Sequence, residues 1–457
     1  MGKELIFQTL RHESAEELPW VPFAGVHVGK LKGYTAEEVL RDEDKLVECL
    51  IEANKIYTPD GLPVIFDLQV EAEILGCDLM WAENNPPSVN SHPIANEKSI
   101  PCSCKIPTPE SGRLPMILSA MRRVKKAIGE DTALYGLICG PFTLASHLRG
   151  TDIFMDMVSD QAYVKELVSY CAQVSIAMSQ MYIDAGMDVI AVVDPLVSQV
   201  SPKHIEKMLS EAFKAVFDYI RAKGAFSSFF VCGNATKQIE VMCKMGPDGV
   251  SVDENVNLPV AKEVTDQYNI TIGGNIPLTT TMLHGTQEDN MKGVIDLIDS
   301  LDHFNLIVSP GCDMPYDTPI ENTIACAQAV KHPDSTRKLI ENYEVVIDDS
   351  DVEIPDYAGL DKPMIELFLL DPEQCAACTY MLASVEDNWE TLKDIASEYR
   401  VYKYFIKEDI ARTRKMGIAN LPTMCINGQQ KFISIIPSRE ELIEAVKEAQ
   451  KQMQAEN

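Results

Sequence analysis

Short apolar runs alternate with longer amphipathic stretches over about the first 335 residues of the chain. This alternation is typical of repeated β–α units. The short runs predict eight strands, at residues 20–23, 62–66, 134–139, 189–193, 227–231, 249–252, 271–274 and 306–308. Eight parallel strands that are each followed by a helix close into a barrel. We therefore predict a (β/α)8 barrel, the TIM-barrel fold, for this part of the chain.

Signals for helix ends support the alternation. Thr35 and Glu38 have the spacing of a capping box ahead of the amphipathic run at residues 39–56. Ser201, which a proline follows, predicts the start of a helix that stops at Gly224. Proline fits the first helical position, and glycine fits the turn just after the last one.

The alternation is interrupted at two places. Residues 84–108 are rich in Pro, Ser and Asn and predict a long loop over one end of the barrel. After Lys331 the β–α period is lost, and an acidic stretch follows. We therefore predict a barrel domain over residues 1–333, an acidic linker over residues 334–362 and a smaller domain over residues 363–457.

Composition narrows the function classes. The formal net charge is −29, from 69 acidic and 40 basic residues. Such a charge repels nucleic acid and anionic lipid, so we expect neither nucleic acid nor a membrane as a partner. No apolar run approaches the ~20 residues of a membrane-spanning helix, and the N-terminus lacks an apolar secretion signal. We expect a cytoplasmic protein in which most of the 13 cysteines are reduced.

Polar residues and cysteines follow the predicted strands. In a barrel of this kind the catalytic groups lie at the C-terminal ends of the strands. The groups at those positions are Asp67, Asp194, Cys232, Asn234, Asp253, Asn275, Cys312 and Asp313. A random surface loop would carry Lys and Glu instead. We therefore predict a functional site at this mouth of the barrel.

Several of these segments resemble one known superfamily. They are residues 188–195 (DVIAVVDP), 232–236 (CGNAT), 252–256 (VDENV), 274–277 (GNIP), 309–315 (SPGCDMP) and 318–322 (TPIEN). Together they resemble the uroporphyrinogen decarboxylase superfamily, most closely its methylcobamide:coenzyme M methyltransferase branch, over roughly residues 1–332. The resemblance implies a barrel enzyme that moves a methyl group between a corrinoid and a thiol.

The resemblance also implies a zinc site. In that branch zinc is held by a His-x-Cys after the fifth strand and by a Cys in the turn after the eighth. Cys232 and Cys312 match the two cysteines, but Phe230 stands at the histidine position and cannot bind a metal. Either another group supplies the third ligand or the metal is absent. The groups considered are His27, Asp67, Glu71, Asp194 and Asp313, and His27 is included in the predicted metal site.

The first hypothesis is a corrinoid-dependent methyltransferase that acts on a small-molecule thiol or methylated substrate. Cys232 and Cys312 bind a metal or the sulfur of the substrate. Asp194 and Asn234 orient polar groups, and Asp67 acts on a proton or a cation. No cobalamin-binding domain is recognisable in the sequence, so the methylcorrinoid would arrive on a separate corrinoid-binding protein. A homodimer is left open.

Two alternatives are kept. One is a decarboxylase that releases CO2 from a carboxylic substrate, with Asp67 at the position of the aspartate that binds pyrroles in the decarboxylase branch. That branch also uses an N-terminal arginine pair, whereas residues 22–33 contain Lys30 and Lys32 but no Arg. An acidic protein without those cations should bind a polycarboxylate poorly. The other alternative is a thiol–disulfide redox or ligand-binding protein with a non-catalytic barrel.

The last part of the chain carries a second motif. Cys375-Ala-Ala-Cys378 follows an apolar strand and opens a helix, whose dipole lowers the pKa of a thiol. Pro422 lies in a segment that resembles the cis-proline segment of thioredoxins, and the order of elements also resembles that fold. The resemblance implies a small thioredoxin-like α/β domain whose redox site, Cys375, Cys378 and Pro422, keeps barrel thiols or a substrate disulfide reduced. Thioredoxin's Trp and Gly-Pro are absent, so a domain used only for docking is the alternative.

Overall fold

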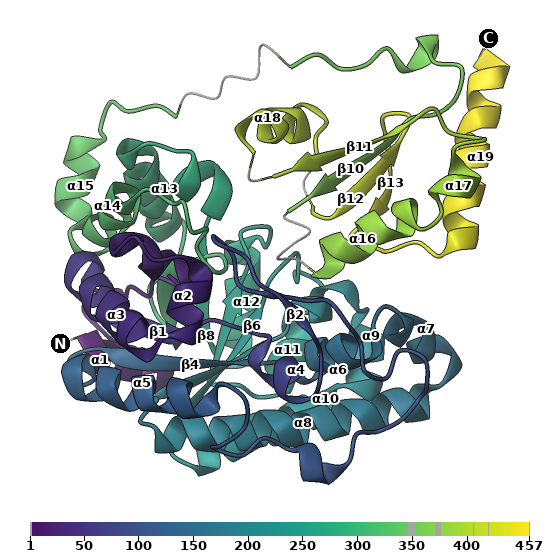
Figure 1. Ribbon diagram of the computed structural model, residues 1–457. Helices are drawn as coiled ribbons and strands as arrows, with labels where there is room; N and C mark the ends of the chain where they lie inside the picture. The colour runs from purple at the N-terminus through teal and green to yellow at the C-terminus, as the bar shows by residue number, and fades with distance from the viewer. Residues whose placement is uncertain (1, 346–351, 371–375, 405, 419, 457) are drawn as a thin grey trace. The chain divides into compact units, whose positions relative to one another are not determined.

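The chain divides into two compact units, Met1–Tyr343 and Glu344–Asn457. The computed structural model describes residues 2–345, 352–370, 376–404, 406–418 and 420–456 (Figure 1). Helix α15 (Pro333–Leu339) packs against helices α13 (Gln287–Asp299) and α14 (Ile320–Lys331), so it belongs to the first unit. The predicted linker therefore starts too early, because its first residues complete the helical layer of the first unit.

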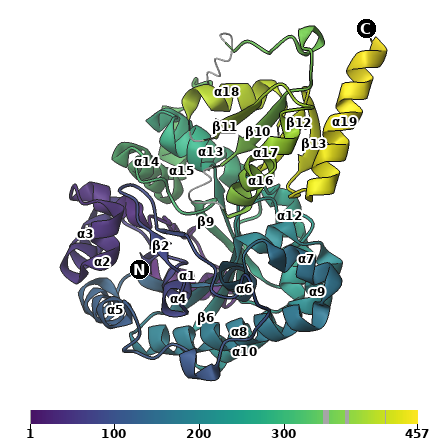
Figure 2. The same ribbon diagram turned by 45° about the vertical axis from the view of Figure 1, so that its right-hand side comes forward.

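A parallel sheet of seven strands forms the centre of the first unit. In spatial order the strands are β1 (Gly61–Ile65), β4 (Ala133–Cys139), β5 (Val189–Val193), β6 (Phe226–Val231), β7 (Gly249–Val252), β8 (Thr271–Ile276) and β9 (Leu306–Pro310). All six neighbouring pairs are parallel. Helices surround these strands (Figure 2), which is the α/β architecture expected of a barrel.

The predicted first strand, residues 20–23, is not a regular strand. Trp20 forms one isolated parallel bridge, with Val308 of β9. On its other side the Trp20 carbonyl accepts a hydrogen bond from the backbone N–H of Asp60, at 2.9 Å. The segment thus lies between β9 and the start of β1 and occupies the eighth position of the barrel. Pro19 precedes the segment and Pro22 lies within it, and because proline has no N–H the ladder cannot extend.

The interior of the sheet is a packed apolar core. Phe230, on β6, lies with its ring centroid 4.7 Å from that of Phe23 and 6.0 Å from that of Phe66. Tyr135 of β4 packs against Phe23 from the other side, at 6.2 Å. Cys232 and Cys312 lie against the same cluster. The core therefore supports the strand ends from below, as in other filled barrels.

The helix signals of the sequence are confirmed, with one general difference. The Thr35–Glu38 capping box is present, and the Ser201 hydroxyl caps the next predicted helix by accepting from the His204 N–H. Each predicted helix is divided in two, giving α2 (Ala36–Arg41) with α3 (Glu43–Tyr57), and α9 (Pro202–Met208) with α10 (Ser210–Ala222). Asp42 divides the first pair because its carboxylate caps α3.

The remaining helices of the first unit follow or connect its strands. They are α1 (Gly2–Leu10), α4 (Val70–Ile74), α5 (Leu114–Ile128), α6 (Pro141–Arg149), α7 (Asp152–Ser159), α8 (Gln161–Asp184), α11 (Ile239–Lys244) and α12 (Leu258–Gln267). The loop predicted at residues 84–108 is confirmed, with only strand β3 (Ser88–Val89), paired to β2 (Leu79–Met80), and one 3-10 turn, Ser103–Lys105. Among the described residues, no helix is both long and apolar enough to cross a bilayer.

The second unit has a separate four-stranded sheet in the order β11 (Tyr399–Lys403), β10 (Ile365–Leu369), β12 (Thr423–Ile426), β13 (Gln429–Ile433). The pair β10–β11 is parallel, and the other two pairs are antiparallel. Helices α16 (Ala376–Glu386), α17 (Trp389–Leu392) and α19 (Arg439–Glu456) supply side chains to the larger apolar cluster. Phe368 and Cys425 on the other face of the sheet pack against Met416, which follows α18 (Lys407–Lys415).

A buried ion pair joins α18 to the central strand of this sheet. Arg412 lies with Nη2 2.6 Å from Oε1 of Glu366, and the two side chains are 4% and 0% exposed. The second carboxylate oxygen of Glu366 accepts from the Tyr357 hydroxyl at 2.6 Å. A buried pair of this kind is costly to break from one side, because the remaining charge stays desolvated.

We predict that Glu366→Gln lowers the free energy of unfolding of the second unit by about 3 kcal/mol. The amide removes the negative charge and leaves the Arg412 guanidinium uncompensated. Hydrogen exchange of the most protected β10 and β12 amides in the full chain measures this change. The matched control is Glu398→Gln, which loses only an exposed pair with Arg400 and should change protection little. Equal effects of the two substitutions would contradict the prediction.

Candidate active site

The structure brings Cys232 and Cys312 together at the C-terminal ends of two strands. Cys232 directly follows β6, and Cys312 follows β9 by two residues. The two form a disulfide, with 6.1 Å between their Cα atoms and 80 residues between them in sequence. Both are half-buried. The convergence that the strand-end positions predicted is therefore present, in the form of a bond between the two sulfur atoms.

Tight backbone packing sets the path of both turns. Gly233 has φ +81°, a conformation that glycine adopts without strain. A Cβ on Gly311 would lie 2.5 Å from the backbone nitrogen of Glu254, so only glycine fits there. The Asn275 amide donates 2.8 Å hydrogen bonds to the carbonyls of Asp253 and Val256 and fixes the neighbouring turn. Each turn is thus held by its own backbone contacts.

These residues do not make the predicted metal site. Phe230 is buried in the barrel core and has no ligand atom to offer. The sulfur atoms of Cys232 and Cys312 are bonded to each other. Among the described residues, no three His, Cys, Asp or Glu side chains are arranged to hold an ion. The donor set therefore does not fit zinc, which needs at least three protein ligands.

His27, predicted as a metal ligand, is used by the scaffold. Its Nδ1 lies 2.9 Å from the Tyr316 carbonyl, which can only accept, so Nδ1 carries the proton. Its Nε2 then accepts from the Tyr57 hydroxyl at 2.7 Å. Burial lowers the pKa of the imidazole to about 4, which keeps it neutral. Both ring nitrogens are occupied, so neither is available for a metal in this arrangement.

Asp194 and Asn234 also bond to the protein itself. The Asp194 carboxylate is fully buried and accepts from the backbone N–H groups of Phe142 (2.8 Å) and Thr143 (3.1 Å), at the start of α6. Burial raises the pKa of Asp194 to about 7, although these hydrogen bonds favour its ionised form. The Asn234 side-chain oxygen accepts from the backbone and hydroxyl of Thr236. Both residues shape the mouth by fixing the segments that form it.

Asp67 has an ionic partner that the sequence did not suggest. Arg113, just before α5, places Nη2 2.7 Å from Oδ2 of Asp67. The same guanidinium lies 2.7 Å from Glu73 and stacks 4.9 Å from the Trp81 ring. Arg113 lies far along the chain from Asp67 and belongs to no motif, so the sequence carried no signal for the pair. Asp67 is thus neutralised by a cation at the end of β1.

Two further carboxyl groups near the strand ends are unusual. Glu71 is 1% exposed; its Oε1 accepts from the Cys139 N–H at 2.9 Å, and Oε2 has no hydrogen-bond partner among the described residues. Burial raises the pKa of Glu71 to about 8. Asp313, next to Cys312, likewise has one buried oxygen without such a partner, and burial raises its pKa well above the usual value.

The cysteines of the long loop and of the CxxC motif differ in exposure. Cys102 and Cys104 are exposed in the long loop, where the Cys104 N–H donates to the Cys102 sulfur at 3.2 Å. Cys378 is buried, and its sulfur accepts from the Leu370 N–H at 3.3 Å. The peptide bond before Pro422 is cis. Cys375 lies outside the described residues.

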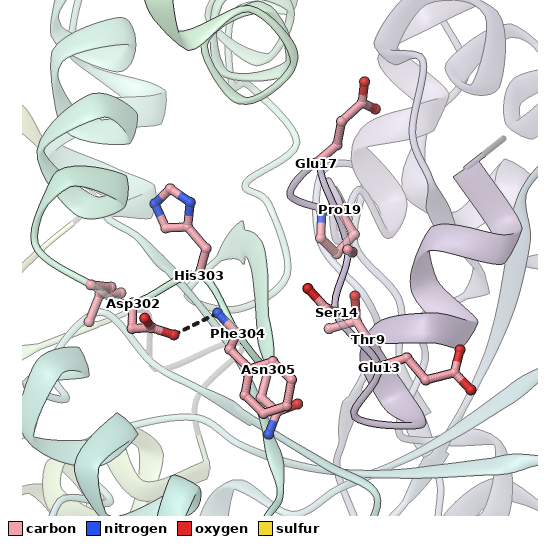
Figure 3. A pocket seen from close by; sticks show the side chains of 11 residues that line it. Thr9, Glu13, Ser14, Glu17, Pro19, Asp302, His303, Phe304 and Asn305 are labelled. Carbon is pink, nitrogen blue, oxygen red and sulfur yellow. Dashed lines mark hydrogen bonds between the residues drawn. The ribbon is translucent and has the colours of Figure 1, made fainter.

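A surface pocket of about 430 Å³ lies at the opposite end of the strands. It is lined by residues that precede them, with Glu13, Ser14 and Glu17 on one side and Asp302 and His303 on the other (Figure 3). In (β/α)8 barrels this end serves stability and the other end serves chemistry. The pocket is therefore separate from the mouth that contains Cys232 and Cys312.

We predict that Glu71→Gln flattens the pH dependence of stability of the first unit. The folded pKa of Glu71, about 8, lies above the ordinary glutamate value of 4.5, so the folded state holds a proton that the unfolded state has lost. Stability therefore falls as pH rises from about 4.5 to 8. Glutamine keeps the acceptor for Cys139 and should remove this loss, roughly a few kcal/mol at pH 8.

Urea unfolding at pH 5 and pH 8 in a Trp389→Phe background checks this, because Trp20 and Trp81 then report on the first unit alone. Glu130→Gln, at an exposed position, is the control and should keep the wild-type pH dependence. A variant that stays as pH-dependent as the wild type would show that Glu71 is ionised in the folded protein.

Comparison with known proteins identifies relatives of the first unit. A family model for uroporphyrinogen decarboxylase (URO-D) matches residues 1–333. The methylcobamide:CoM methyltransferase MtbA of Methanosarcina acetivorans is 27% identical over 342 residues, which cover 72% of this chain and 98% of that protein. The uroporphyrinogen decarboxylase of Wolbachia sp. subsp. Brugia malayi is 27% identical over 302 residues, with coverage of 64% and 83%.

A solved structure described as a methyltransferase from Methanosarcina mazei has the same fold. Its TM-score is 0.64 at 22% identity, and the match covers 72% of this chain and 98% of the other. The family match ends at residue 333, close to the end of the first unit at Tyr343. Because the matched segment is well over half of the chain and contains the whole seven-stranded sheet, the chain belongs to the uroporphyrinogen decarboxylase family of enzymes.

Proposed function

We propose that this chain is a corrinoid-dependent methyltransferase that uses a small thiol as methyl acceptor. The observation that carries the proposal is the meeting of Cys232 and Cys312 at the mouth of the barrel. Relatives named methylcobamide:CoM methyltransferases, which this chain matches over 98% of their length, support the same reaction class. The methylcorrinoid would be presented by a separate corrinoid-binding protein. A cytoplasmic location and a homodimer stay predictions.

In the reaction, the thiolate sulfur gains the methyl carbon and the corrinoid cobalt keeps the electron pair of the broken bond. The reduced Cys232 and Cys312 would flank the acceptor sulfur at the top of the apolar core. Asp194 and Asn234 would act as positioning residues, because their side chains bond to the mouth segments themselves. Asp67 would hold Arg113 in place as a cation near the mouth.

We predict that Cys232→Ser and Cys312→Ser each lower methyl transfer by at least about tenfold, since each removes one of the two sulfur atoms at the mouth. The assay follows the absorbance of methylcobalamin with coenzyme M as acceptor, on reduced protein under nitrogen. Cys102→Ser, at an exposed position in the loop, is the control and should keep the wild-type rate. Unchanged rates in both mouth variants would rule out a role for the pair.

Decarboxylation is the second candidate function. Asp67 stands at the end of β1, and a uroporphyrinogen decarboxylase is among the relatives. The Arg113 partner argues against it, because a neutralised Asp67 is less able to stabilise a protonated pyrrole. Release of CO2 from a carboxylic substrate by metal-free protein, without methyl transfer, would favour this function. The third alternative, a non-catalytic barrel, has less support than either, because the barrel's relatives are enzymes.

We further propose that the second unit is a thioredoxin-like dithiol domain. The strand order β11-β10-β12-β13, in which only β10 and β11 are parallel, supports it. Cys378 lies in the first turn of α16. Cys375 completes the motif in the sequence. Its role would be to deliver electrons to the barrel cysteines or to a disulfide form of the substrate.

We predict that the full chain catalyses reduction of insulin disulfides by dithiothreitol, and that Cys375→Ser abolishes this activity, because the CxxC pair is its only proposed carrier. Turbidity of the released insulin B chain measures it. Cys425→Ser is the control; Cys425 is buried on the sheet face that packs against Met416, and the activity should persist without it. Activity that survives in the Cys375 variant would leave the second unit with a docking role.

A further inference from the structure

We infer that Cys232 and Cys312 are a redox couple that switches the barrel mouth on and off, in place of a permanent metal site. In the disulfide form the two sulfur atoms are bonded to each other and cannot act on an acceptor thiol. In the dithiol form both are free to do so. The effect on methyl transfer rests on the proposed function, whereas the redox step itself does not.

The mouth does not depend on the disulfide for its shape. Strands β6 and β9 are separated by β7 and β8, and continuous parallel pairing already joins all four. Beyond the strands, the Gly311 N–H donates to the Ile276 carbonyl at 3.0 Å, and the Met314 N–H donates to Phe23 at 2.8 Å. Asn275 holds the turn after β7 through two carbonyls. The backbone N–H of Gly233, next to Cys232, donates to the Asp253 carboxylate. Because these bonds hold both cysteine turns, the disulfide can open without loss of the fold.

The pair also differs from the other cysteines of the chain. Apart from Cys378, nine further cysteines among the described residues are free thiols, and seven of those are buried. Cys232 and Cys312 are half-buried, so a small thiolate or a protruding dithiol can approach them. Burial raises the pKa of thiols such as Cys139, Cys171 and Cys326, which keeps them protonated and unreactive. The disulfide is therefore placed where exchange is feasible in an otherwise reduced protein.

The chemistry balances with a dithiol as reductant. One thiolate of the dithiol attacks the sulfur of Cys232 or Cys312, the bond between them breaks, and a mixed disulfide forms. The second thiolate of the reductant then attacks that mixed disulfide. Two electrons and two protons end on Cys232 and Cys312, and the reductant leaves as a disulfide. The CxxC motif of the same chain belongs to this class of reductant, as does dithiothreitol.

The test uses the full chain equilibrated in buffers of graded reduced and oxidised dithiothreitol. Acid quenching, alkylation with light and heavy iodoacetamide and peptide mass spectrometry give the oxidised fraction at each cysteine, and methyl transfer from methylcobalamin to coenzyme M is timed on the same samples. We expect Cys232 and Cys312 to titrate together and reversibly, Cys326 to stay reduced, and the rate to fall at least about tenfold in the oxidised form.

A double variant, Cys102→Ser with Cys104→Ser, removes the exposed loop thiols and should leave the titration and the rates unchanged. The inference is overturned if Cys232 and Cys312 stay thiols at every ratio, if the chain binds one zinc through them, or if both redox forms transfer methyl groups equally fast. Reversible titration with no methyl transfer in either form would overturn the proposed function and the switch of activity, and would support the redox couple alone.

Discussion

The parallel alignment of the strands is the constraint on which the rest of the structure depends. Seven strands run in one direction, and the short segment at Trp20 closes the gap between β9 and β1. The C-terminal ends of all these strands therefore meet at one mouth of the barrel, whatever the distance between them along the chain. Two cysteines 80 residues apart can form a bond only because of this arrangement. The apolar core beneath, with Phe230 and its aromatic neighbours, keeps the strand ends from moving inward.

Burial determines what the acidic groups near the mouth do. In a low-dielectric surrounding, a carboxylate must find donors, find a cation or take up a proton. Asp194 finds donors, because it accepts from backbone N–H groups at the start of α6. Asp67 finds a cation, the Arg113 guanidinium. Glu71 takes up a proton, because the hydrogen bond from the Cys139 N–H is not enough to keep the carboxylate charged. Residues that look catalytic from their position at strand ends thus carry much of the local architecture.

The sequence predicted the barrel because short apolar runs and capping signals are local, and seven of the eight expected strands are present. The remaining segment, residues 20–23, forms a single bridge because Pro19 and Pro22 lack the N–H groups that a longer ladder needs. Its residues are apolar and buried, so in the sequence it looks like the other strands. The meeting of Cys232 and Cys312 could also be foreseen, since strand order fixes it. The partners of Asp67 and His27 could not, because Arg113 and Tyr57 reach them through tertiary packing that no spacing records.

The phenylalanine at position 230, where the resemblance implies a histidine, and the CxxC motif on the same chain are linked by thiol chemistry. Two thiols held close together without a metal oxidise readily, because the disulfide they form adds little conformational cost to a framework that is already fixed. A protein that keeps such a pair for chemistry then needs a source of electrons. If the second unit is the dithiol domain that we propose, its tether to the same chain makes the effective concentration of reductant independent of the protein concentration. Under this proposal, a thiol pair served by a dithiol of the same chain responds to its redox surroundings, which a closed zinc site does not.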